Sequence, residues 1–212
     1  MIDSKAIIWD YNGTLLDDLS IGVQCINTML TKRELPLLSK DQYREVFTFP
    51  VKKYYETVGF NFNKEDWDIT AKEFISLYTS LLPDSNIFPE AIQLLSQFKS
   101  LGKKQFILSA MEQNMLNKSV KTENISTFFS EVSGIDNIYA SSKIENGKKM
   151  IEKHQLAANE VCLLGDTVHD YEVSQELGCQ CILIAAGHQS IEKLKQTGCP
   201  NVVNHLNDII KN

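Results

Sequence analysis

The sequence lacks several features that would place the chain in a special class. No apolar run approaches the roughly 20 residues that span a bilayer, and residues 1–5 show no signal-peptide pattern. The five cysteines are scattered without C-x-x-C spacing, which argues against a zinc site and is typical of a reducing compartment. A net charge of -6 argues against a nucleic-acid-binding surface. We therefore expect a cytoplasmic protein whose partners are neither membranes nor nucleic acids.

The chain is organised around its first apolar run. Residues 6–9 are all apolar and lead directly into Asp10 and then into the turn residues Asn12 and Gly13. A short apolar run that ends in turn residues is typical of a buried parallel strand. Asp10 would then lie at the carboxyl end of the strand, where open α/β sheets bind their ligands. A carboxylate at this place is a nucleophile, a metal ligand or both, whereas the alternative is an Asp that only starts a turn.

The segment after this strand is helical over about 70 residues. Apolar residues at helical spacing predict helices over 19–30, 39–47, 50–58 and 64–82, with no convincing strand between them. Asp18 or Ser20 is a plausible N-cap of the first helix, and Ser39 of the second. Pro50 suits the first turn of the third helix. The block cannot lie in a sheet, so it is best explained as a helical cap domain over residues 17–84.

From residue 85 onward, strands and helices alternate. The pattern predicts strands over 105–109, 128–134, 161–166 and 180–185, and helices over 89–99, 111–120, 146–154, 170–177 and 191–197. Such alternation is typical of a parallel sheet with right-handed crossovers. The expected fold is therefore α/β, a doubly wound parallel sheet, with a core domain of residues 1–16 and 85–212 that carries the inserted cap.

Polar residues follow four of the expected strands and would meet at one edge of the sheet. They are Asp10 with Asn12, then Ser109, then a lysine near 143, then Asp166 with Asp170. Each is weak evidence alone, because a serine such as Ser109 is often only a helix N-cap and Lys143 could be an ordinary surface lysine. Lys148 is a rival to Lys143 for the site, although we favour Lys143. The order and placement of the four groups together are much more specific.

This set of motifs resembles the haloacid dehalogenase-like hydrolase superfamily over the whole chain. The residues that carry the resemblance are 10–14 (DYNGT), Ser109, Lys143 and 165–170 (GDTVHD). The cap is similar to that of the phosphoglycolate-phosphatase-like branch, notably over 47–51 (FTFPV), 54–56 and 59–60. The resemblance implies a Rossmann-like core and a Mg²⁺-dependent phosphatase that acts on a small phosphorylated metabolite. It leaves open whether the protein is a monomer or a homodimer.

The resemblance also implies a role for each motif residue. Asp10 would attack phosphorus and form an aspartyl-phosphate. Asp10, Asp166 and the main-chain carbonyl of Asn12 would hold Mg²⁺, with Asp170 as a ligand through water or as a residue that holds the site together. The phosphate would contact Gly13, Thr14, Ser109, Ala110 and Lys143, with help from amide groups at the helix start after Ser109.

Asn12 departs from the pattern of the superfamily's phosphatases, most of which carry Asp there. That Asp protonates the leaving alcohol and then activates water, and an amide has no proton to give near neutral pH. Another group, such as His169, His188 or a group of the substrate, would have to serve. Two alternatives remain. One is a hydrolase of C–Cl or C–P bonds, and the other is a catalytically weak protein that binds a phosphate ligand or has a regulatory role.

Overall fold

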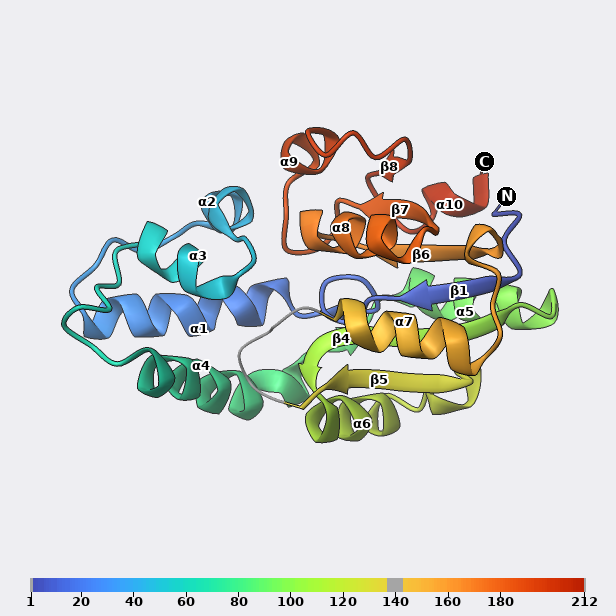
Figure 1. Cartoon of the computed structure of the whole chain (residues 1–212). Coiled ribbons are helices and arrows are strands. Elements are labelled where there is room, and N and C mark those ends of the chain that lie inside the picture. The colour runs from blue at the N-terminus through green and yellow to red at the C-terminus, as the bar shows by residue number, and fades with distance from the viewer. Residues whose placement is uncertain (1, 137–142, 212) are drawn as a thin grey trace.

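A six-stranded parallel sheet forms the centre of the molecule in the computed structural model, which describes residues 2–136 and 143–211 (Figure 1). The strand order is β5-β4-β1-β6-β7-β8. The strands are β1 (Ala6–Trp9), β4 (Lys104–Glu112), β5 (Glu131–Ile135), β6 (Val161–Gly165), β7 (Gln180–Ile184) and β8 (Val202–Val203). The predicted fold class, a doubly wound α/β sheet, is confirmed.

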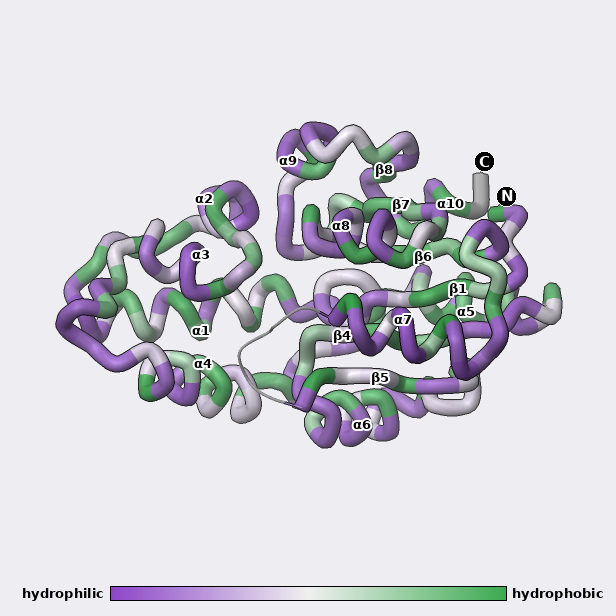
Figure 2. Tube along the Cα trace, viewed as in Figure 1, coloured by the Kyte–Doolittle hydropathy of each residue, from purple (hydrophilic) through white to green (hydrophobic). Residues whose placement is uncertain are grey.

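Strand β1 is buried on both faces because it lies between β4 and β6. Ile7 and Trp9 belong to one hydrophobic cluster, and Ala6 and Ile8 belong to the other, as the two-residue period of a strand requires. The first cluster is covered by α5 (Pro89–Ser100), α6 (Gln113–Thr122) and α10 (Asp208–Lys211). The second is covered by α7 (Ile144–Lys153), α8 (Val168–Leu177) and α9 (Ile191–Lys195). Figure 2 shows hydrophobic residues gathered along the central strands and alternating with hydrophilic ones along the helices.

Four helices between β1 and β4 form an insertion that lies beyond the carboxyl end of β1 (Figure 1). They are α1 (Leu19–Lys32), α2 (Lys40–Val46), α3 (Val51–Thr57) and α4 (Trp67–Leu81). Their shared core is rich in aromatic side chains, among them Tyr43, Tyr54, Tyr55 and Phe60. The insertion therefore places an aromatic cluster next to the edge of the sheet where the polar strand ends meet.

A short antiparallel ribbon joins the insertion to the sheet domain. It consists of β2 (Leu16–Asp17) and β3 (Asn86–Ile87), which pair where the chain leaves the first strand and returns to the core. The sequence analysis predicted neither strand, and β2 reaches into the first residue of the segment that was expected to be helical throughout. Two-residue strands are too short to produce a period, and their pairing joins segments about 70 residues apart in the sequence.

Several element boundaries differ from the sequence prediction. Strand β4 continues to Glu112, so helix α6 begins at Gln113 rather than at Met111. Helix α4 begins at Trp67 rather than at residue 64, because the Asp66 side chain accepts a hydrogen bond from the Ile69 amide and caps it. Strand β8 was not predicted. These differences arise where a cap or a neighbouring strand, rather than periodicity, sets the end of an element.

The predicted caps are found in part. Ser39 caps α2 with a complete capping box, in which Gln42 is the partner. Pro50 occupies the N-cap position of α3 rather than its first helical position. Asp18 is the N-cap residue of α1 but makes no capping hydrogen bond with its side chain. Its carboxylate is used elsewhere, as described below. Within the described ranges, no helix has the length and apolar character needed to cross a bilayer.

Candidate active site

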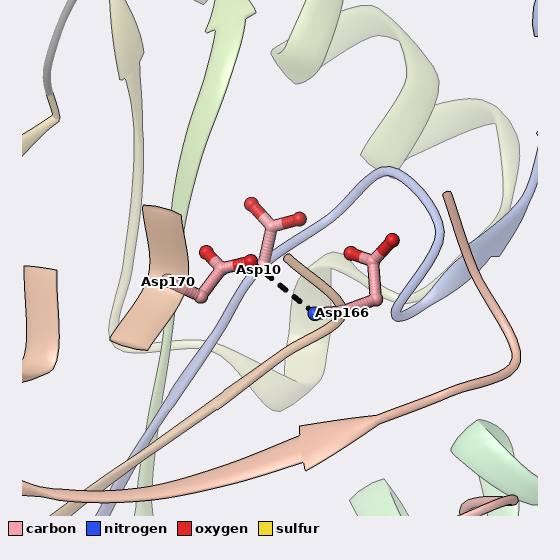
Figure 3. A group of neighbouring side chains, drawn as sticks. All are labelled: Asp10, Asp166 and Asp170. Atoms are coloured by element: carbon pink, nitrogen blue, oxygen red, sulfur yellow. Dashed lines mark hydrogen bonds between the residues drawn. The ribbon is translucent and has the colours of Figure 1, made fainter. Parts of the chain in front are cut away.

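Three carboxylates meet at the carboxyl edge of the sheet (Figure 3). Asp10 follows β1, Asp166 follows β6, and Asp170 lies in the first turn of α8. One oxygen from each lies within 4.8 Å of the others, and the three residues are at most 7% exposed. The convergence that the sequence order predicted is therefore present for these three residues.

The sequence around Asp170 fixes where its carboxylate points. Thr167 and Asp170 form a capping box, and Asp170 Oδ2 accepts hydrogen bonds from the Asp166 amide at 3.2 Å and from Thr167 Oγ1 at 2.7 Å. A Cβ at Gly165 would lie 2.3 Å from Asp170 Cγ, so only glycine fits before this turn. The other oxygen of Asp170 is left to face the rest of the cluster.

Lys143 supplies the positive charge of the cluster. Its Nζ lies 2.5 Å from Asp10 Oδ1 and 2.6 Å from Asp170 Oδ1, and the residue is only 2% exposed. The rival Lys148 is exposed and pairs with Glu145 at 3.4 Å. Of the two lysines considered, the structure brings Lys143 into the cluster and leaves Lys148 at the surface.

The cluster carries more negative than positive charge. Burial raises the pKa of Asp10, and the neighbouring Asp170 and Asp166 add to the rise, while Lys143 opposes it. Burial also raises the pKa of Asp166 to about 6. The pKa of Asp170 is lowered, because Lys143 outweighs the effect of burial.

The residues present fit a divalent cation. Three ionised carboxylates and one ammonium leave two negative charges without balance. Their oxygens are the hard ligands that Mg²⁺ prefers, and a cation of charge two would neutralise the surplus.

The turn after β1 holds Asp166 in place. Thr14 Oγ1 donates to Asp166 Oδ1 at 3.0 Å, and the His188 amide donates to Asp166 Oδ2 at 2.6 Å. Gly13 has φ of +72°, and a Cβ there would lie 2.3 Å from Asp166 Oδ2. The Gly13 amide donates to Asp18 Oδ1 at 2.8 Å. The polar groups of Gly13 and Thr14 are thus engaged within the protein, and their expected contact with phosphate stays a prediction.

Ser109 lies beside this turn but not at a helix start. Its Oγ accepts a hydrogen bond from the Met111 amide at 3.1 Å and lies 3.5 Å from Asn12 Oδ1. The first amides of α6 are bonded to the Glu112 carboxylate, at 2.9 Å for both Asn114 and Met115. The expected help from helix amides directly after Ser109 is therefore not found.

Asp18 and Tyr78 belong to the site although the sequence analysis did not assign them to it. The Asn12 amide donates to Asp18 Oδ2 at 2.9 Å and to the Tyr78 hydroxyl at 2.7 Å, and that hydroxyl donates to Asp18 Oδ2 at 2.6 Å. Both side-chain N–H groups of Asn12 are thus engaged, and its amide oxygen lies next to Ser109 Oγ. In the sequence, Asp18 looks like a helix cap and Tyr78 looks like an ordinary helix residue. Nothing in the neighbouring sequence therefore indicates that either residue belongs to the site.

His188 completes this network. Its Nε2 lies 3.1 Å from Asp18 Oδ1, and its Nδ1 is 3.0 Å from the Tyr43 hydroxyl. Burial alone would lower the pKa of His188, but Asp18, with Asp166 and Asp10, raises it to about 9. His188 is therefore a buried imidazolium at neutral pH. His169 lies apart from Asp18 and pairs with Glu172 at 3.1 Å.

A cavity of about 170 Å³ opens above Asp10, between the sheet edge and the inserted helices. Its floor contains Asp10, Asn12, Ser109, Ala110 and Lys143, and its other walls come largely from α2–α4. The expected site residues that reach this cavity come from four places: the turn after β1, strand β4, the start of α7 and the first turn of α8. The arrangement can place an electrophile against the Asp10 carboxylate with Lys143 beside it.

The comparisons with known proteins agree with this geometry. A family model described as haloacid dehalogenase-like hydrolase matches residues 7–184. The phosphoglycolate phosphatase of Caulobacter vibrioides is 23% identical over 218 residues, which cover 99% of this chain and 91% of that protein. The probable phosphatase IndB of Dickeya dadantii is 20% identical and covers 96% of this chain and 91% of that protein.

Solved structures share the fold at low identity. A predicted phosphatase from Clostridium acetobutylicum superposes with a TM-score of 0.79 at 16% identity, covering 98% of this chain and 97% of that one. A hydrolase from Pseudomonas syringae gives 0.75 at 17% identity, covering 97% and 96%. The resemblance drawn from the four motifs is confirmed.

The His188–Asp18 pair predicts a loss of stability in mild alkali. The folded pKa of His188 is about 9, above the 6.5 of a free imidazole. The stabilisation is therefore complete below pH 6.5 and is lost as the pH rises through 9. We expect the difference in free energy of unfolding between the wild type and His188→Gln to shrink by about 3 kcal/mol from pH 6.5 to pH 10.

Urea unfolding in a metal-free buffer would measure this difference. His205→Gln is the matched control, because His205 is exposed and its replacement should leave the pH dependence unchanged. A constant difference between the wild type and His188→Gln over this range would mean that His188 is neutral in the folded protein.

Proposed function

Because the chain belongs to the haloacid dehalogenase-like hydrolase family, we propose that it hydrolyses the phosphate monoester of a small metabolite, with Asp10 as nucleophile and Mg²⁺ as cofactor. The observation that carries the proposal is the buried contact of Asp10 with Lys143 inside a group of carboxylates with surplus negative charge. Relatives with the name phosphoglycolate phosphatase support a phosphate monoester as the substrate.

The first half-reaction would be carried by Asp10. Its carboxylate oxygen attacks phosphorus, the bond between phosphorus and the bridging oxygen breaks, and that oxygen leaves with the electron pair. Lys143 stabilises the Asp10 carboxylate and the charge of the phosphoryl oxygens during the approach. In the second half-reaction, water attacks the phosphorus of the aspartyl-phosphate and releases inorganic phosphate and the free carboxylate.

The metal would be held by Asp10, Asp166 and the main-chain carbonyl of Asn12, with Asp170 close by. A bound Mg²⁺ supplies positive charge that lowers the repulsion between an anionic nucleophile and an anionic phosphate. Thr14 and the His188 amide orient Asp166 for this role through their hydrogen bonds to its two oxygens.

Replacement of the nucleophile tests the proposal most directly. We expect Asp10→Asn to abolish Mg²⁺-dependent phosphate release from a panel of p-nitrophenyl phosphate, phosphoglycolate, sugar phosphates and nucleotides, because an amide cannot attack phosphorus. The fold should be retained, since Asn has nearly the same shape. The control is Asp17→Asn, which changes an exposed carboxylate nearby.

Two outcomes would contradict this scheme. Turnover retained by Asp10→Asn would remove Asp10 as nucleophile. A wild-type protein that binds Mg²⁺ but is silent over the whole panel would favour a protein that binds phosphate ligands without hydrolysing them.

The two lysines provide a matched pair. We expect Lys143→Met to lower kcat/KM by about 10²–10³-fold, the usual cost of removing one electrostatic contact to the transition state. Lys148→Met should change kcat/KM by less than about twofold, because Lys148 is a surface residue with only weak ion pairs. Steady-state kinetics on p-nitrophenyl phosphate would measure both. If Lys148→Met lowered kcat/KM more than Lys143→Met does, Lys143 would be excluded as the site lysine.

A further inference from the structure

Aromatic side chains line the side of the cavity that faces the inserted helices. Eight of its lining residues are Phe, Tyr or Trp, and all eight come from the inserted helices and their connections. Phe74 and Tyr78 stack with ring centres 5.8 Å apart, and Phe47 meets Tyr54 edge to face at 5.3 Å. Such walls favour a flat apolar ligand. A cavity of about 150 Å³ is known to accept benzene, so 170 Å³ suits a single ring.

Among the described residues, three basic side chains line the cavity, and each is paired with a carboxylate: Lys143 with Asp10 and Asp170, His188 with Asp18, and His169 with Glu172. His169 pairs only through Nδ1, and its Nε2 is buried without a hydrogen-bond partner, so it is the one nitrogen of these three side chains that is open to a ligand. Arg44 of α2 does not line the cavity and bonds to the main-chain oxygens of Ala185 and Gln189. A carboxylate, such as that of phosphoglycolate, would lose its water here without gaining a free cation.

The one buried hydroxyl that the walls leave unpaired is neutral. Tyr54 is 2% exposed, and its oxygen has no hydrogen-bond partner within residues 2–136 and 143–211. A buried hydroxyl without a partner costs free energy, and a ligand in the cavity could satisfy it. Tyr54 therefore offers a hydrogen bond to one polar group of a ligand in the cavity.

Asn12 restricts the leaving group. Both of its N–H groups are held by Asp18 and Tyr78, so Asn12 presents only an acceptor to the cavity. It can neither protonate a leaving oxygen nor donate a hydrogen bond to it. An alkoxide, whose conjugate acid is about as weak as water, leaves poorly without a proton. A phenolate, with a pKa of about 10 as in Tyr, leaves without one.

We propose that the substrate is an aryl phosphate, a phosphate monoester on the hydroxyl of a single uncharged aromatic ring, rather than phosphoglycolate or a sugar phosphate. The proposal rests on the proposed function, because it takes Asp10 as the nucleophile. The bond between phosphorus and the phenolic oxygen breaks, the electron pair leaves with the phenolate, and the phenolate takes its proton from water. The ring lies among Phe47, Tyr54 and Phe74.

Four phosphates separate the ring from the leaving group. Phenyl phosphate has both the ring and a good leaving group, benzyl phosphate has the ring only, acetyl phosphate has the leaving group only, and ethyl phosphate has neither. With the full-length protein and Mg²⁺, we expect KM to be about tenfold lower for the two ring compounds. We expect kcat to be about 10²-fold higher for phenyl than for benzyl phosphate. Phosphoglycolate should have a kcat/KM about 10²-fold below that of phenyl phosphate.

A variant tests the leaving-group argument separately. Asn12→Asp restores a proton donor beside Asp18, so it should raise kcat on benzyl phosphate about 10²-fold more than it changes kcat on phenyl phosphate. An equal effect on both substrates would overturn the role given to Asn12.

Binding gives a readout that does not depend on turnover. Phenylphosphonate and phosphonoacetate cannot be hydrolysed at a bridging oxygen, and they differ in carrying a ring or a carboxylate. Calorimetry on the wild type should show about tenfold tighter binding of phenylphosphonate. Phosphonoacetate that binds as tightly or more tightly would overturn the proposal.

The outcomes distinguish this inference from the proposed function. Hydrolysis of acetyl phosphate that is lost in Asp10→Asn, without any preference for a ring, would leave the proposed function standing and overturn the aryl substrate. If the protein released no phosphate from the four test compounds or from phosphoglycolate, this would overturn the proposed function and, with it, aryl phosphate as a substrate. Preferred binding of phenylphosphonate would then support only the ring specificity of the cavity.

Discussion

The site depends on how one buried ammonium is shared among buried carboxylates. Lys143 lies within 2.6 Å of oxygens from Asp10 and Asp170, which belong to two different segments of the chain. Burying a charge without a partner is costly, so each of these groups is stable only while the others are present. The parallel sheet makes this possible, because the carboxyl ends of β1 and β6 are neighbours. Because negative charge remains after this pairing, the cluster has the donor set that a cation would need.

A second buried charge, the Asp18 carboxylate, connects the inserted helices to the turn after β1. Asp18 accepts hydrogen bonds from Asn12 and Tyr78 and pairs with His188. These groups come from the turn after β1, from α4 and from the loop after β7. The position of the insertion over the sheet is therefore coupled to the orientation of the residue two places after Asp10. A change in the insertion that moved Tyr78 would free one N–H of Asn12 and alter what the cavity presents to a leaving group.

The parts of the site that the sequence predicted are those with local signals. Asp10 and Asp166 directly follow apolar runs, and Asp170 lies in a capping box four residues later; a strand end or a capping box needs only nearby residues to be identified. Lys143 was distinguishable from Lys148 only by its long-range contacts. Asp18 and Tyr78 meet across 60 residues of sequence, and His188 meets Asp18 across 170. No periodicity reports such contacts, just as none reported the two-residue strands β2, β3 and β8.

The difference between local sequence motifs and long-range contacts also explains why similarity over the whole chain does not identify the substrate. The relatives at 20–23% identity align over nearly the entire chain, and such an alignment reflects mainly the sheet, the helices and the motifs at the strand ends. Selection of the organic group depends instead on a few side chains of the insertion and on one amide at position 12. A carboxylate on the substrate would need a cation that is not already paired, and an alkyl leaving oxygen would need a proton donor. Among the described residues, Lys143, His188 and His169 are paired with carboxylates, and Asn12 presents only an acceptor. These two requirements, one for charge and one for a proton, both disfavour phosphoglycolate.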